Sequence, residues 1–124
     1  MTHHRNARLN EQLKREISHI LSRKVRDPRV GLVLVTEARV SPDLSVARVF
    51  FRPQGNGDGV EVEETLEGLE AAAPFVRREL GKVLRLRRIP ELRFEYDTTL
   101  DTARRIEEVL KEVLPGEGER EETE

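Results

Sequence analysis

The sequence LEAAAPFVRREL at residues 69–80 places a proline inside a helical pattern, and this conflict decides the fold. Apolar residues recur every three or four positions from Val62 to Val83, which predicts one long helical register. Pro74 cannot donate a backbone hydrogen bond and clashes with the preceding turn, which costs about 3 kcal/mol in a straight helix. We therefore expect two helices joined by a sharp interhelical kink. The expected kink consists of Ala72, Ala73 and Pro74.

The charge changes sign across the expected kink. Residues 53–76 carry six Asp or Glu and no Lys or Arg, whereas residues 77–96 carry seven Lys or Arg and three Asp or Glu. At about 100° per residue, the side chains of Arg78, Lys82 and Arg85 fall in one helical sector. The second helix is therefore expected to present an exposed basic stripe.

The residues before this region predict one helix and two strands. Apolar residues at helical spacing from Leu9 to Val25 predict a helix, which the pair Asp27-Pro28 ends because a residue before proline disfavours helical backbone angles. Residues 32–40 and 45–52 alternate in polarity around a turn signal at Ser41-Pro42-Asp43, so we expect adjacent antiparallel strands. Strict alternation in the first strand places these residues on one face: Leu32, Leu34, Thr36, Ala38 and Val40.

The residues after the kink predict a third strand and a last helix. Leu92, Phe94 and Tyr96 alternate with charged residues, as in a half-buried strand. Residues 103–114 carry apolar side chains at helical spacing, so an amphipathic helix follows. We expect residues 1–114 to form one domain and residues 115–124 to be a disordered acidic tail.

The composition limits the class of protein. The chain has 124 residues, of which 37% are charged and none is cysteine. This length favours one domain, and the lack of cysteine excludes disulfides and suits a reducing compartment. No apolar run approaches the roughly 20 residues that cross a bilayer, so we expect a cytoplasmic protein. The formal net charge is −2, but the charge blocks predict that the fold gathers its cations in a single patch on one face and its acids on the reverse side.

The sequence contains little that supports catalysis or metal binding. His3, His4 and His19 have no carboxylate or cysteine placed to complete a metal site. No serine lies in a Gly-x-Ser-x-Gly elbow, and acidic pairs such as Glu63 and Glu67 belong to an exposed helix face. We therefore expect no enzyme activity, no metal and no cofactor.

Basic side chains are the candidate binding residues. Arginine outnumbers lysine by 18 to 4, and a guanidinium group can contact two phosphate oxygens at once. Phe50 could stack on a base if it were exposed, but an aromatic residue in a strand is more often in the core. Arg87 has a structural alternative, which is to pair with Asp97 or another acid near the third strand. The predicted phosphate-contacting residues are Lys14, Arg15, Arg48, Arg52, Arg77, Arg78, Lys82, Arg85, Arg88 and Arg93.

Three motifs carry a resemblance to a known family. They are Asp27-Pro28-Arg29-Val30-Gly31, the segment SPDLSVARV at 41–49 and the segment LRRIPELRFEYD at 86–97. In this order they resemble the ribosome-binding factor A family, over roughly residues 6–114. The expected order α-β-β-α-kink-α-β also resembles the type II KH fold, a single-stranded nucleic-acid module, followed here by a C-terminal helix. The resemblance implies an α+β fold with an Ala-x-Gly kink in place of the Gly-x-x-Gly loop; in this chain proline stands where the family has the glycine of that kink.

The resemblance also implies a function. Members of this family are bacterial assembly factors that bind the free small (30S) ribosomal subunit and its 16S rRNA, assist late maturation and 5′-end processing of the rRNA, and support growth in the cold. We further expect a monomer with no small-molecule substrate and no membrane partner. The alternative is a protein-interaction module that docks by its C-terminal helix.

Overall fold

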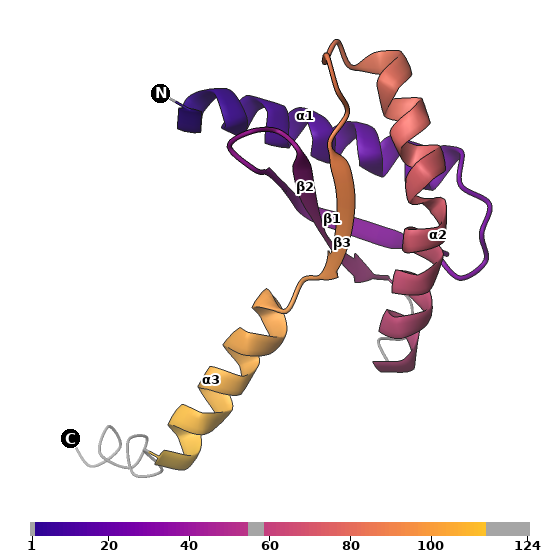
Figure 1. Cartoon of the computed structure of the whole chain (residues 1–124). Helices are drawn as coiled ribbons and strands as arrows, with labels where there is room; N and C mark the ends of the chain where they lie inside the picture. The colour runs from indigo at the N-terminus through magenta and orange to yellow at the C-terminus, as the bar shows by residue number, and fades with distance from the viewer. Residues whose placement is uncertain (1, 55–58, 114–124) are drawn as a thin grey trace.

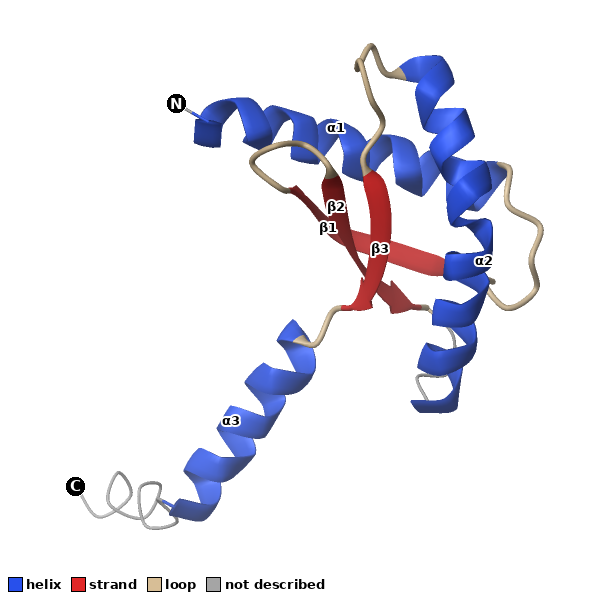
Figure 2. Cartoon of the chain, viewed as in Figure 1, coloured by secondary structure: helices blue, strands red, loops and turns tan. Residues whose placement is uncertain are grey.

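The computed structural model describes residues 2–54 and 59–113, which form an α+β fold with three helices and one three-stranded sheet. Buried residues of the first two helices and of all three strands join in one core. Figures 1 and 2 show the third helix pointing away from this body. The predicted α+β class is confirmed, and the KH likeness stays a prediction. The elements are α1 (Thr2–Arg23), β1 (Val33–Val40), β2 (Val46–Pro53), α2 (Gly59–Val83), β3 (Glu91–Tyr96) and α3 (Thr99–Val113).

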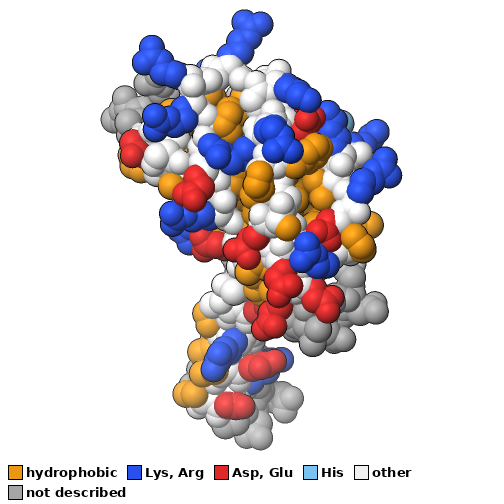
Figure 3. Space-filling model, turned by 45° about the vertical axis from the view of Figure 1, so that its right-hand side comes forward, with side chains coloured by type: hydrophobic (Ala, Val, Ile, Leu, Met, Phe, Trp, Pro, Cys, Tyr) orange, Lys and Arg blue, Asp and Glu red, His pale blue; other side chains and the backbone are white. Residues whose placement is uncertain are grey.

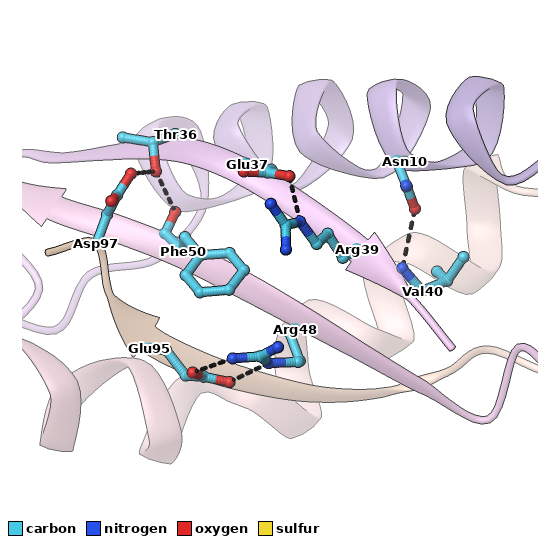
Figure 4. A network of polar contacts seen from close by, with 9 residues as sticks. All are labelled: Asn10, Thr36, Glu37, Arg39, Val40, Arg48, Phe50, Glu95 and Asp97. Atoms are coloured by element: carbon cyan, nitrogen blue, oxygen red, sulfur yellow. Dashed lines mark hydrogen bonds and ion pairs between the residues drawn. The ribbon is translucent and has the colours of Figure 1, made fainter. Parts of the chain in front are cut away.

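The first helix, α1, begins and ends earlier than the expected span of residues 9–25. Its end is marked by Lys24 and Val25, whose backbone N–H groups both donate to the carbonyl of Ile20, at 2.8 and 3.2 Å. Nearer its other end the side-chain oxygen of Asn10 accepts a hydrogen bond from the Val40 N–H at 2.9 Å (Figure 4). The helix contributes the buried side chains of Leu13, Ile17, Ile20 and Leu21 to the core.

Strands β1 and β2 are antiparallel, as expected, but β1 does not alternate strictly. Its register shifts between Val35 and Glu37, so Thr36 is an extra residue in a β-bulge. The bulge reverses the alternation before it, so Val35 is buried while Leu32 and Leu34 are 72% and 49% exposed. The expectation that Leu32 and Leu34 share a face with Ala38 and Val40 is wrong for this reason.

Strand β3 lies beside β2 in the sheet order β1-β2-β3 and runs parallel to it. The pairing begins where the N–H of Glu91 donates to the carbonyl of Ser45 at 2.9 Å. Leu92 and Phe94 are buried against the core. Two parallel strands need a long crossover connection, which α2 supplies.

The expected pair of helices is one continuous helix, α2, with Pro74 inside it. Figure 1 shows that the axis of α2 bends between its two halves. Leu69 and Val76, on either side of the proline, are both fully buried. Their packing holds both halves of the helix against the core, so the chain keeps its helical conformation despite the lost hydrogen bond. The expected break at Ala72, Ala73 and Pro74 is therefore corrected to a bend within one helix.

Helix α2 ends at Val83, before the last residue of the expected basic stripe. The Leu84 N–H still donates to the carbonyl of Leu80 at 2.8 Å, and Leu84 is the buried residue at this end. Val83 is 54% exposed. Val83 therefore does not belong to the buried stripe, and Arg85 lies in the connection to β3 rather than on the helix.

Gly68 allows α2 to approach the connection between α1 and β1. A Cβ atom at this position would lie 2.9 Å from the Cβ of Arg29 and 3.0 Å from the Cγ2 of Val30. The first distance is shorter than real Cβ atoms show and the second is tighter than most Cβ contacts, so a larger residue would force the neighbouring segment to shift. The approach places the first half of α2 against residues 29 and 30.

Helix α3 has no buried residue. Its first turn is attached to the sheet, because the Asp97 carboxylate accepts the Thr99 N–H at 2.9 Å and the Tyr96 hydroxyl donates to Asp101 at 2.6 Å. The expected amphipathic helix is thus present, with its apolar stripe uncovered. The expected acidic tail, residues 115–124, lies outside the described residues. The exposed stripe consists of Leu100, Ile106, Val109, Leu110 and Val113.

Candidate functional site

Several exposed cations near the end of α2 have no ion-pair partner among the described residues. Within residues 2–54 and 59–113, Arg78 on the helix and Arg85 and Arg88 in the connection to β3 form no ion pair. In Figure 3, Lys and Arg side chains cluster on the upper part of the face shown and Asp and Glu side chains lie lower. The charge along the chain also changes, from the acidic residues 53–76 to the basic residues 77–96.

Arg77 fixes the connection that carries these cations. Its Nε donates to the carbonyl of Pro90 at 3.1 Å and its Nη2 to the carbonyl of Ile89 at 2.9 Å. Pro90 is fully buried, so the contact joins the helix to the start of β3. The predicted phosphate-contacting Arg77 therefore has a structural role in holding residues 84–90.

Glu79 on α2 binds two lysines, Lys24 just after the end of α1 and Lys82 on α2 itself. Its carboxylate accepts a hydrogen bond from Lys24 at 2.7 Å and from Lys82 at 2.8 Å, and the residue is only 8% exposed. These two bonds, led by the Lys24 bond, lower the pKa of Glu79 to about 2. The group keeps a net positive charge, because one carboxylate meets two ammonium groups. The contact brings the C-terminal end of α1 beside the second half of α2.

Sequence patterns did not single out the basic residues at this end of α1 as binding residues. Arg23 and Arg26 flank Lys24 in sequence, are exposed and form no ion pair within the described ranges. Periodicity assigned this segment to a helix but gave no sign that α2 would lie against it. Only the folded structure brings Lys24, in the middle of this basic segment, to the same carboxylate as Lys82.

A groove separates α2 from the connection between α1 and β1, and we call it the α1-side groove. Its volume is about 300 Å³. Phe75 lies half-buried in its wall, with the Arg78 guanidinium carbon 5.9 Å from the ring centroid. An aromatic and an arginine three residues apart on a helix can make this contact, so the sequence did contain a signal for the pair. The groove is lined by Lys24, Val25, Arg26, Asp27, Ala71, Ala72 and Phe75.

A second groove lies between α2 and the edge strand β3, and we call it the β3-side groove. Its volume is about 480 Å³. Three carboxylates and one guanidinium group line it, and that guanidinium group, from Arg93, is 3.3 Å from the Glu91 carboxylate. The groove is lined by Glu70, Ala73, Glu91, Leu92, Arg93, Phe94 and Glu95.

The open face of the sheet holds its arginines in ion pairs. Arg48 donates from Nε and Nη2 to Glu95 at 2.6 and 2.8 Å, which lowers the pKa of Glu95. Arg39 pairs with Glu37 on β1. The ring of Phe50 lies between the two arginines, 5.0 Å from the guanidinium carbon of Arg48 and 5.6 Å from that of Arg39 (Figure 4). Phe50 is therefore half-buried on the open face, and the expectation that it belongs to the core is wrong because its neighbour in sequence, residue 51, takes the inward position.

Arg52 and Asp97 act at the end of the sheet where α3 begins. Arg52 donates to the Asp97 carbonyl at 2.7 Å and lies 3.6 Å from the Asp101 carboxylate. The Asp97 carboxylate accepts the Thr36 hydroxyl at 2.5 Å, and this bond is the main cause of its lowered pKa. Arg87 forms no ion pair in the part of the chain that the structure describes, so the alternative that it pairs with Asp97 is wrong.

The ten predicted residues therefore do not form one patch of unpaired cations. Arg78, Lys82, Arg85 and Arg88 share the second half of α2 and the following connection, to which Arg77 is hydrogen-bonded. Lys14 and Arg15 lie on α1, without an ion pair among the described residues. The remaining three, Arg48, Arg52 and Arg93, are held by acids of the sheet or of α3.

The structure also limits other kinds of site. Among the described residues, no three His, Cys, Asp or Glu side chains are grouped so that they could hold a metal ion. None of the described helices combines the length and apolar character of a membrane span. The fold and site define a small α+β binding protein whose candidate site is a charged, grooved surface built on one helix.

Comparison with known proteins identifies the family. A family model described as ribosome-binding factor A matches residues 5–110. The crystal structure of ribosome-binding factor A from Thermus thermophilus is similar with a TM-score of 0.65 and 31% identity, over 73% of this chain and 93% of that chain. A homology model of the Thermus thermophilus factor, fitted into a cryo-EM map of a 30S complex, is similar with a TM-score of 0.57 and 29% identity, over 72% and 91% of the two chains. The chain belongs to the ribosome-binding factor A family.

Proposed function

We propose that this protein binds the free small ribosomal subunit and contacts the phosphates of 16S rRNA with the second half of α2 and the connection to β3. Family membership and the 30S complex of the Thermus thermophilus factor support the choice of partner. Arg78, Arg85 and Arg88 carry the assignment of the surface, because they lie close together along the chain and form no ion pair within residues 2–54 and 59–113, which leaves their charge available to a polyanion.

Binding energy supplies the mechanism, without a chemical step, a cofactor or a small-molecule substrate. A factor that prefers one arrangement of the subunit shifts the conformational equilibrium by its difference in affinity for the two arrangements. Late maturation of the subunit, 5′-end processing of its rRNA and growth in the cold would depend on this shift. The acids on the first half of α2 repel phosphate and orient the molecule on the RNA. The protein acts as a monomer in the cytoplasm.

Salt dependence of binding tests this proposal. The affinity for purified small subunits is measured by co-sedimentation at several salt concentrations, with complete ribosomes as the comparison. Each phosphate contact contributes a slope of about −0.7 to −0.9 to the plot of log affinity against log salt. A flat salt response, or equal binding to complete ribosomes, contradicts the proposal.

A charge-reversal variant locates the surface. Replacing Arg78, Lys82 and Arg85 together by Glu is expected to abolish binding while the circular dichroism spectrum and the unfolding temperature show a folded protein. The matched control replaces Arg104, Arg105 and Lys111 on α3 by Glu, which changes the net charge by the same amount. Loss of binding in the control alone contradicts the assignment to α2.

The uncovered stripe on α3 supports the second candidate, docking onto another protein by the C-terminal helix. Five large apolar side chains on this helix are about half exposed or more. Exposed apolar surface of this kind often marks an interaction site. Under this alternative, Ile106→Ser combined with Leu110→Ser abolishes binding to the subunit and the α2 triple variant does not.

A further inference from the structure

The α1-side groove combines features that suit a planar, apolar group that carries anionic groups on either side. Ala71 and Ala72 leave room at the middle of α2, and Val25 forms the opposite apolar wall. The ring of Phe75 lies in the wall formed by α2, half-buried. A volume of about 300 Å³ is at the small end of clefts that hold ligands, and so fits one ring system rather than a folded segment.

The rim of this groove is positive. Arg26 and Arg78 are exposed and free of ion pairs within residues 2–54 and 59–113. Asp27 is the acid in the lining, and Arg29 binds it with its Nη2 at 2.7 Å, so that its charge is offset. The ammonium group of Lys24 is held at the rim by Glu79.

The contact between Phe75 and Arg78 prepares the ring for stacking. The guanidinium carbon of Arg78 lies 5.9 Å from the ring centroid, within the range of a cation–π interaction. Bases of single-stranded RNA stack on aromatic rings and on guanidinium planes, whereas bases within a duplex are already stacked on each other. The groove therefore offers a stacking surface with cations placed for the phosphates on either side.

We propose that the α1-side groove holds one unstacked base of a single-stranded RNA segment, with Phe75 as the stacking surface and with Arg26 and Arg78 on the flanking phosphates. This inference rests on the proposed function and names the form of RNA that the surface takes. An acidic peptide is the competing ligand, since it also fits a positive rim. The base is favoured because the groove has an aromatic wall in addition to its charge.

Two aromatic substitutions test the proposal in the full-length protein. Phe75→Leu is compared with Phe50→Leu, a matched control because Phe50 is also half-buried and has arginines over its ring. Affinities are measured by fluorescence anisotropy for a single-stranded RNA of about ten nucleotides, within the range of known single-strand site sizes, and for the duplex of the same sequence. Phe75→Leu is expected to lower the single-strand affinity about tenfold with an unchanged salt slope, because stacking releases no counterions. Phe50→Leu is expected to leave the single-strand affinity unchanged, and Phe75→Leu is expected to leave the duplex affinity unchanged.

A tryptophan variant keeps the test valid if Phe75→Leu fails to fold. The chain contains no Trp, so Phe75→Trp introduces a single indole fluorophore at the groove. Stacking of a base on this indole quenches its emission when single-stranded RNA is added, and the same residue introduced as Phe50→Trp is not quenched. Equal quenching at both positions, or none at position 75, overturns the inference.

The results separate this inference from the proposed function. Salt-dependent RNA binding that Phe75→Leu leaves unchanged overturns the stacking site and keeps the phosphate-binding surface. RNA binding without any salt dependence overturns the proposed function itself. A poly-glutamate peptide whose binding falls in Phe75→Leu, while the single-strand affinity stays the same, assigns the groove to an acidic peptide and also overturns the inference.

Discussion

The two grooves beside the middle of α2 differ in charge although they share the same stretch of helix. The α1-side groove has Lys24 and Arg26 in its lining and Arg78 beside its aromatic wall. The β3-side groove has three carboxylates and a guanidinium group that one of them binds. Both contain alanines of the Ala71–Ala73 run and other apolar side chains, so apolar character does not distinguish them. The charged side chains that the neighbouring elements bring to the rim decide which groove can accept an anion.

This comparison shows how a chain with a net charge of −2 can present a surface for a polyanion. The acids of the sheet hold Arg48 and Arg93 on the β3 side of the molecule. On the α1 side, a single carboxylate, Glu79, meets two lysines. Local pairing of charges, rather than the total charge, therefore selects the binding face.

Charge reversal on the two sides of α2 tests this difference most strongly. We expect Arg26→Glu combined with Arg78→Glu to lower the affinity for single-stranded RNA about 100-fold near 0.1 M salt, because two phosphate contacts become repulsive. The control, Arg39→Glu combined with Arg93→Glu, has the same charge change at residues that are already paired with acids. Filter binding measures both variants. Equal losses would show that only the total charge matters.

A second change tests the packing that forms the α1-side groove. Gly68→Ala places a Cβ atom 2.9 Å from the Cβ of Arg29, so the α1–β1 connection must shift. We expect it to lower the free energy of unfolding by about 1–3 kcal/mol, although alanine favours helix more than glycine does. Urea denaturation measures this change.

The matched control for that change is Gly81→Ala. A Cβ atom at Gly81 would lie 3.8 Å from the Cγ1 of Ile89, an ordinary contact. This variant is expected to raise the free energy of unfolding by up to about 1 kcal/mol through helix propensity alone. If both variants stabilise the protein, α2 does not lie tightly against residues 29 and 30.

The smallest expected effect is the acid dependence of the contact between α1 and α2. The pKa of Glu79 is lowered from 4.5 to about 2, so its contribution to stability is complete above pH 4.5 and is lost as the pH falls toward 2. Glu79→Gln is expected to reduce the loss of stability across this interval and to leave the pH dependence above that interval unchanged. Thermal unfolding of the variant and of the parent protein at several pH values measures this loss of stability.

Asp43 provides the control for the acid titration. Its pKa is also lowered to about 2, mainly because the carboxylate accepts a hydrogen bond from the Ser41 hydroxyl. Asp43 lies in the β1–β2 turn rather than between two helices. Asp43→Asn should reduce the acid dependence without changing the RNA affinity at neutral pH. Identical RNA affinities of Glu79→Gln and the parent protein at that pH would argue against a role for the Glu79 contact in the binding surface.

Local patterns predicted most elements of the fold. Apolar spacing and the Asp27-Pro28 pair placed α1, and alternation placed β1, β2 and β3, because these signals depend on neighbouring residues alone. The same signals failed at Thr36 and at Pro74. A bulge and a bend inside a helix are decided by what the rest of the chain packs against them, which periodicity does not contain.

The sequence by itself determined the class of fold, the family motifs and the separation of charge along α2. The tertiary structure alone decided which cations are unpaired, because Arg48 meets Glu95 from 47 residues away and Lys24 meets Glu79 from 55 residues away. It also placed Phe75 in a basic groove and Phe50 on a sheet face with paired charges. Helical and strand periods act over a few residues, whereas electrostatic interactions between side chains depend on distances that only the folded chain sets.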